Sequence, residues 1–175
     1  MIDRRRRQVL ALAAAPAALA ACSMAANTRF PTLEAAEQVL RDLPADARTR
    51  SGWPLAQVLE HAAQSVEYSL RGFPQPKPAW FQASAGRAAF ALFAARGRMS
   101  HSLTDPIPGA PELAMTSLPT AHDHLLKALA DFRAHDGALQ PHFAYGALDK
   151  PRYTLAHLMH LDDHWSDIDT LKHTA

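Results

Sequence analysis

The chain has 175 residues, with 18 Lys and Arg against 17 Asp and Glu, so its formal charge is +1 when the 10 histidines are neutral. This balance provides no basic surface of the kind that binds nucleic acid, and we expect no nucleic-acid partner. The single cysteine, Cys22, excludes an intrachain disulfide.

Residues 1–22 have the composition of a signal peptide, which is no part of the fold. Arginines form its basic start, and the apolar run that follows is too short to span a bilayer, which takes ~20 residues. Arg6 and Arg7, followed by "QVL", resemble the twin-arginine motif that exports folded cargo. Arg5 stands where that motif usually has Ser or Thr.

The signal ends in "LAAC", which resembles a bacterial lipobox with Cys22 as the lipidated first residue of the mature protein. The alternatives are an uncleaved anchor helix and cleavage nearby at an Ala-rich site. We therefore expect an exported, membrane-anchored lipoprotein that faces the periplasm or the cell exterior. Lipidation of Cys22 would leave no free thiol, which excludes a cysteine nucleophile and a thiolate metal ligand.

The mature chain would lose four Arg and one Asp, so 14 basic residues would face 16 acidic ones and the formal charge would become −2. We expect residues 23–31 to be a tether. Residues 32–175 have the length of one ordinary domain.

Apolar residues at helical spacing predict a short leading helix and four main helices. Thr32 is a suitable N-cap for the first, and Pro54 and Gly72 mark the start and end of the second. Gly97 and Gly137 end the next two. The predicted helices are residues 32–43, 53–71, 79–96, 120–135 and 152–172.

No segment alternates with period two, so the predicted fold class is all-α, a four-helix bundle with long connectors. The connector of residues 97–119 contains "DPIPGAPEL". Connectors of this length usually carry function or cover a site.

The last predicted helix carries "HLMHLDDHW", residues 157–165, with three histidines on one side of the helix, beside its buried stripe. His160 and His164 are one turn apart and could chelate one metal ion. His157 and His160 form a rival pair, whereas His157 and His164 are about 10 Å apart along the axis, too far to share an ion easily.

Two histidines make half a site, and His61, on the matching shoulder of the second predicted helix, is the natural third ligand because bundles build metal sites from facing helices. The alternative is a chance cluster, because the chain is rich in histidine and such pairs are often only solvated.

Two blocks resemble the DinB-like superfamily, closest to one of its branches of uncharacterised domains. They are "WPLAQVLEHAAQSVEYSLRGFPQPKPAWF", residues 53–81, and "PHFAYGALDKPRYTLAHLMHLDDHW", residues 141–165. The resemblance implies a four-helix bundle whose divalent metal is held by His61, His160 and His164. Many members follow the last ligand with an Arg-Gly-Gln turn, where this chain has Trp165-Ser166-Asp167. Any activity that needs that turn is therefore in question.

Other side chains are weaker candidates. His142 could reach the mouth of the site or only bond to backbone, and Tyr68 could donate a hydrogen bond near the site or only pack at the core edge. The remaining polar candidates are expected to be solvated: His122, His124, Asp162 and Asp163. The aromatic ones are expected in the core: Trp80, Phe81, Phe90 and Phe93.

Three imidazoles would leave positions on the ion open for water or substrate, as in a catalytic site. The first hypothesis is a metal-dependent transferase or hydrolase that acts on a small molecule, with zinc, nickel or iron as the ion. The alternative is a non-catalytic envelope protein, a binding or structural bundle with vestigial histidines. The oligomeric state, monomer or dimer, stays open.

Overall fold

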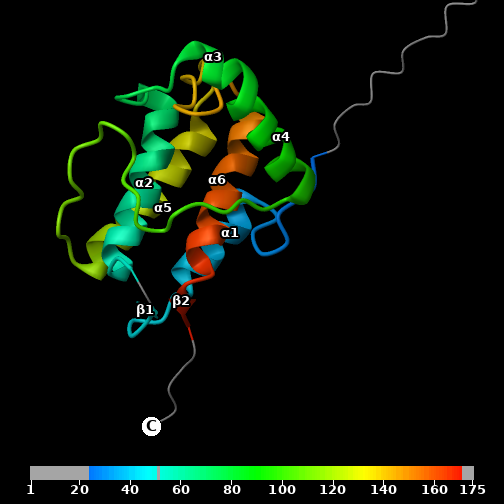
Figure 1. Cartoon of the computed structure of the whole chain (residues 1–175). Coiled ribbons are helices and arrows are strands. Elements are labelled where there is room, and N and C mark those ends of the chain that lie inside the picture. Colours follow the sequence, from blue (N-terminus) through cyan, green and yellow to red (C-terminus); the bar gives the residue numbers. More distant parts are fainter. Residues whose placement is uncertain (1–23, 51, 171–175) are drawn as a thin grey trace, which may run out of the picture.

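The computed structural model describes residues 24–50 and 52–170, and these are mostly helical, as expected (Figure 1). The helices are α1 (Leu33–Arg41), α2 (Leu55–Arg71), α3 (Ala79–Phe81), α4 (Arg87–Arg96), α5 (Leu118–Ala134) and α6 (Lys150–Trp165). Arg6, Arg7 and Cys22 lie outside the described residues. Among the described residues, no helix is long and apolar enough to cross a membrane.

The expectation of an all-helical chain misses one small feature, an antiparallel pair of two-residue strands, β1 (Arg48–Thr49) and β2 (Ile168–Asp169). This pair explains why α6 ends at Trp165 and not near residue 172. Ile168 is buried, and the chain leaves the helix to place it beside β1.

Side-chain caps fix where the helices begin. Thr32 Oγ1 accepts a hydrogen bond from Ala35 N at 3.2 Å, as expected from the sequence. Ser117 caps α5 through Thr120 N, and Asp149 caps α6 through Arg152 N at 3.0 Å. Both helices therefore start two residues before their predicted first residues.

The third predicted helix is broken, because a π-helical turn, η1 (Gln82–Gly86), separates α3 from α4. A Cβ on Gly86 would lie 2.0 Å from Ala144 O, so only glycine allows this turn to touch the α5–α6 connector so closely. Trp80 was expected in the core, but its side chain is 71% exposed.

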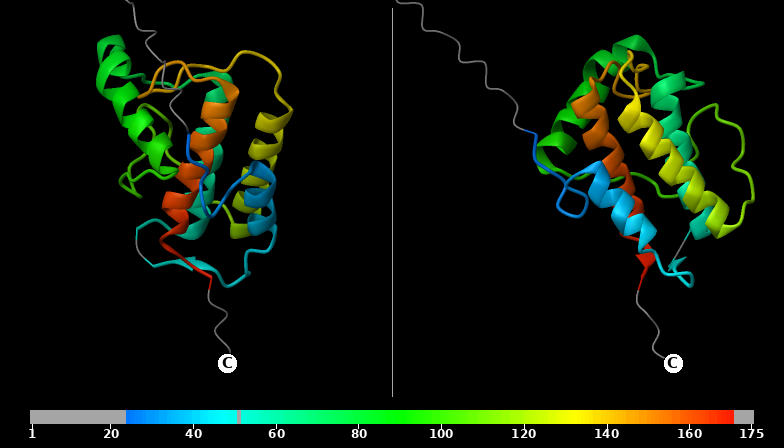
Figure 2. Two further views of the ribbon diagram at one scale, coloured as in Figure 1. Left: turned by 90° about the vertical axis from the view of Figure 1, so that its right-hand side faces the viewer. Right: turned by 180° about the vertical axis from the view of Figure 1, so that it is seen from behind.

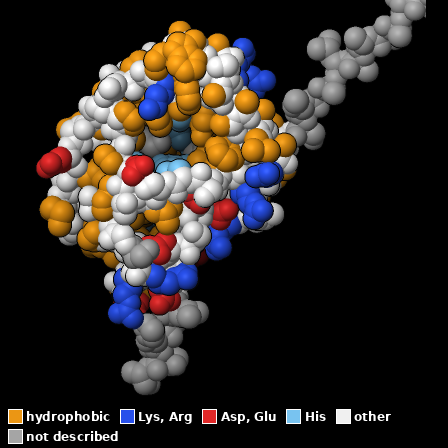
Figure 3. Space-filling model, in the orientation of Figure 1, with side chains coloured by type: hydrophobic (Ala, Val, Ile, Leu, Met, Phe, Trp, Pro, Cys, Tyr) orange, Lys and Arg blue, Asp and Glu red, His pale blue; other side chains and the backbone are white. Residues whose placement is uncertain are grey.

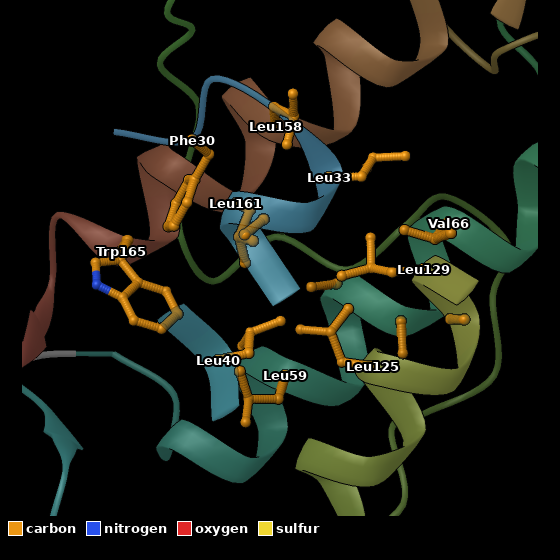
Figure 4. Packing of buried hydrophobic residues seen from close by; sticks show 14 of the residues in the cluster. Phe30, Leu33, Leu40, Leu59, Val66, Leu125, Leu129, Leu158, Leu161 and Trp165 are labelled. Atoms are coloured by element: carbon orange, nitrogen blue, oxygen red, sulfur yellow. The ribbon is translucent and has the colours of Figure 1, made fainter. Parts of the chain in front are cut away.

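Two apolar clusters hold the helices together. The larger one joins α1, α2, α5 and α6, and Figure 4 shows Leu40, Leu59, Leu125 and Leu161 converging from these four helices. The smaller cluster packs α4 against α6, and these two helices, green and orange to red, lie side by side in both views of Figure 2. Its residues are Phe90, Ala94, Leu155, Ala156 and Met159.

The described part of the expected tether packs into the domain. Phe30 is fully buried, and its ring meets the edge of Trp165 at a centroid distance of 5.4 Å. Asn27 is also buried; its Nδ2 donates to Gly97 O and to Asp162 Oδ2, both at 3.0 Å. Residues 27–30 thus join the end of α4 to α6.

We expect Phe30→Ala to lower the free energy of unfolding by about 3–5 kcal/mol, because it opens a cavity beside Trp165. The control Trp80→Ala, at an exposed aromatic residue, should change it by no more than about 0.5 kcal/mol. Urea unfolding measures both. Equal effects would mean that residues 24–31 do not belong to the folded domain.

Candidate metal centre

Helices α2 and α6 bring His61, His160 and His164 together. His160 Nε2 lies 3.2 Å from His61 Nε2 and 3.2 Å from His164 Nε2. His160 and His164 are one turn apart on α6, and His61 faces them from the middle of α2. The three side chains proposed from the sequence therefore meet at their ring nitrogens.

These separations match a tetrahedral ion. Zinc binds imidazole nitrogen at about 2.0–2.1 Å, so two nitrogens on one tetrahedral ion are about 3.3 Å apart. The two observed separations of 3.2 Å agree with this value. An ion would fit between the rings with little movement of either helix.

A fourth histidine, His101, completes a cluster with these three. We call His61, His101, His160 and His164 the histidine cluster; one ligand atom from each lies within 4.8 Å of the others. His101 comes from the α4–α5 connector, residues 97–117. This connector crosses in front of α6 and α2 (Figure 1).

Two hydrogen bonds to Asp163 hold His101 in place. Its Oδ2 accepts hydrogen bonds from His101 N at 2.9 Å and from His101 Nδ1 at 2.6 Å. His101 Nε2 is buried and has no hydrogen-bond partner among the described residues. The expectation that Asp162 and Asp163 lie on a solvated face is wrong, because Asp162 bonds to Asn27 and Arg29 and Asp163 to His101.

Burial keeps the helical histidines neutral. Desolvation, helped by His101, lowers the pKa of His61 to about 4. The pKa of His164 falls to about 3, and that of His160 falls well below its usual value, again first through burial and then through the neighbouring histidines. At neutral pH these rings therefore carry the free lone pairs that metal binding requires.

The rival ligand His157 points elsewhere. It is buried, its Nε2 lies 3.3 Å from Ser69 Oγ, and its ring meets the face of Phe132. It is not part of the histidine cluster. Spacing alone allowed a pair of His157 and His160, but the rotation of α6 directs His157 into the core.

A cavity of about 290 Å³ opens beside the histidine cluster. Figure 3 shows it as a hollow with histidine side chains at its floor and apolar side chains around it. His61, His101 and His160 line it, and the connector forms another wall through Met99 and Ile107. A small molecule in this hollow would lie against the cluster.

The α5–α6 connector also faces the cavity. His142 lines it, as the sequence suggested, and its Nδ1 also accepts from Ala144 N and Tyr145 N. Tyr145 stacks on the His142 ring, and burial raises the pKa of Tyr145 to about 12. Tyr68 does not line the cavity and packs against Phe73.

His122 and His124, expected to be solvated, both have partners inside the protein. His122 Nε2 lies 2.9 Å from Leu40 O. His124 lies between two carboxylates of α2, 2.6 Å from Glu60 and 3.0 Å from Glu67. These contacts connect α5 to α1 and α2 and are separate from the histidine cluster.

A family model described as "Protein of unknown function (DUF1569)" matches residues 23–170. That family is DinB-like in fold. Neither the curated proteins nor the solved structures contain a match to the chain.

We expect the metal-free protein to lose stability as the pH falls below about 6.5, and His157 to contribute to that loss. Burial lowers the pKa of His157 to about 3 in the folded protein, whereas the unfolded chain takes up the proton near 6.5. Below that pH only the unfolded state gains the proton, so the free energy of unfolding falls by up to about 1.4 kcal/mol per pH unit for this residue.

The test is urea unfolding of wild type and His157→Gln, with a chelator, from about pH 8 to about pH 4. At pH 8 the free energies of unfolding of the two proteins should differ only through the contacts that the substitution removes. As the pH is lowered, the free energy of unfolding of the variant should fall less steeply than that of wild type. Parallel curves would show that the pKa of His157 is not lowered in the folded protein.

Proposed function

This chain belongs to the DUF1569 family, which is DinB-like in fold, and we propose that it binds one divalent metal ion through His61, His160 and His164. The observation that carries the proposal is that His160 Nε2 lies 3.2 Å from the Nε2 atoms of both His61 and His164, close to the separation of two nitrogens on a tetrahedral ion. Neutral imidazole ligands suit zinc, nickel or iron.

The proposed reaction is a metal-dependent transfer or hydrolysis on a small molecule. The ion would supply Lewis-acid activation of a water or of a substrate group. The chain's own residues would hold it on α2 and α6 and enclose the substrate in the adjoining cavity. Apolar side chains in the cavity lining, among them Met99, Ile107 and Phe143, support a substrate with an apolar part.

The rival proposal, a non-catalytic envelope protein, has support from the C-terminal end of α6. Trp165 occupies the position of the Arg in the Arg-Gly-Gln turn, and it is buried against Phe30. Ser166 Oγ bonds to Asp163 O, and Asp167 N to His164 O, so both residues take part in the turn that ends α6. Trp165 therefore contributes to packing, and Ser166 and Asp167 contribute to the turn that ends the helix.

For the fold, we propose a four-helix bundle of the DinB-like type. Its main helices would be α2, the segment from α3 to α4, α5 and α6, with α1 as the short leading helix. The family match supports this proposal, as does the packing of α4 on α6.

For the location, we propose export and anchoring of the protein in a membrane through a lipid on Cys22. The basic, apolar leader and its lipobox support this proposal. The first described residues also run along the molecular surface, where Ala25 N bonds to Ala94 O of α4. An anchor at Cys22 would therefore hold the end of α4 near the membrane.

We expect wild type purified without a histidine tag to contain about one metal ion per chain, and His61→Ala, His160→Ala and His164→Ala each to lose it. Elemental analysis after dialysis gives the stoichiometry, and circular dichroism shows whether each variant is folded. The matched control is His157→Ala, on the same helix, which should keep the ion. A wild type that stays metal-free after incubation with zinc or nickel would refute the metal proposal.

We expect wild type expressed in bacteria to incorporate a palmitate analogue and Cys22→Ser to incorporate none, because the thiol is the acceptor of the lipid. Gel fluorescence of the labelled protein measures both. Replacing Arg6 and Arg7 by Lys should reduce labelling if the route is the twin-arginine one. Equal labelling of wild type and Cys22→Ser would refute the anchor.

A further inference from the structure

His101 has the surroundings of a metal ligand. Asp163 accepts from its backbone N–H and from its ring Nδ1, so the ring proton lies on Nδ1. The lone pair then lies on Nε2, which is buried and has no partner. An unpaired buried acceptor is unfavourable, and binding an ion would relieve this cost. A carboxylate on one ring nitrogen and an ion on the other is the usual arrangement of a ligating histidine.

The position of the ring agrees with this role. The centroid of His101 lies 4.8 Å from that of His160 and 4.9 Å from that of His164. No two ligand atoms of the histidine cluster are farther apart than 4.8 Å, so a tetrahedral ion needs at most about 1.5 Å of closure. His101 lies on a connector, which can move by that distance more easily than a helix can.

Further attachments hold the connector on α2 and the core. Thr116 Oγ1 donates to Glu60 Oε1 at 2.8 Å, and Ile107 is buried in the larger apolar cluster. The bonds between His101 and Asp163 attach the first part of the connector to α6. The first part of the connector therefore lies over the proposed ion position, and its His101 side chain can bind the ion.

We propose that His101 is the fourth protein ligand of the metal and that it closes the centre until a ligand displaces it. This inference rests on the proposed metal site and adds to it the element that controls access. A tetrahedral ion with four imidazoles has no open position. His61, His101 and His160 line the cavity together, so a small anion or other donor that enters it competes with His101 for the ion.

The experiment uses the protein loaded with cobalt(II), whose visible absorption reports coordination, and azide as the competing ligand. In wild type, azide binds only when His101 has left the ion, which weakens its apparent affinity by the fraction of open centres. We expect His101→Ala to bind azide at least about tenfold more tightly than wild type, because its fourth position is open. His101→Gln serves as the second variant if His101→Ala folds poorly.

Two further variants distinguish the loss of a metal ligand from an unspecific disturbance of the fold. Asp163→Asn should weaken cobalt binding by no more than about 10–100-fold, because Asp163 is a hydrogen-bond partner of His101 and is not itself a proposed ligand. His122→Gln, at a histidine outside the cavity and the histidine cluster, should leave the cobalt spectrum and the azide affinity as in wild type.

Cobalt-loaded wild type and His101→Ala with the same spectrum and azide affinity would overturn this inference and leave the three-histidine site standing. A wild type that binds no cobalt would refute both.

Discussion

The removal of imidazole rings from water between α2 and α6 is the constraint on which the rest of the centre depends. His61 and His164 are almost fully buried, and each ring would be expensive to protonate there. Their burial lowers their pKa values far below the usual one, which keeps their lone pairs free near neutral pH. The same packing that stabilises the fold thus keeps these imidazole nitrogens unprotonated and able to bind a metal ion.

The outer face of α6 supports the centre in a way that a helical wheel does not reveal. Asp162 and Asp163 would be solvated on an isolated helix, but residues 27–30 and the α4–α5 connector cover them. Asp162 fastens Asn27 and Arg29, and Asp163 fastens His101. The adjacent carboxylates of Asp162 and Asp163 therefore fix two segments that are distant in the sequence. One of these segments, the α4–α5 connector, contributes His101 to the histidine cluster.

The sequence predicted those parts of the fold that depend on local pattern. Helical periodicity and capping residues located α1 and α2 closely, and one-turn spacing identified His160 and His164. Parts that depend on contacts between distant segments were missed. The π-helical turn follows from the close approach of Gly86 to Ala144, and the end of α6 follows from the pairing of Ile168 with β1.

His101 belongs to the second group. It lies in a connector without periodicity, and the nearest other histidine in the sequence is His122, so only the folded chain relates it to His160. The length of that connector was the available signal, since long connectors often cover sites. For Tyr68, the sequence left open a hydrogen bond near the site and packing at the core edge. The structure has the second, because Tyr68 packs against Phe73 and does not line the cavity.

Whether the centre is open or closed decides between the two functional classes. With three ligands, the ion would face the cavity with a free position, as catalysis requires. With His101 bound, the centre resembles a closed structural site, and the ion would fasten the connector to α2 and α6. An exchange between these states reconciles the two hypotheses, because Asp163 could hold the displaced His101 nearby while a ligand occupies its place. This exchange depends on the buried Nε2 of His101, which has no hydrogen-bond partner in the part of the chain that the structure describes.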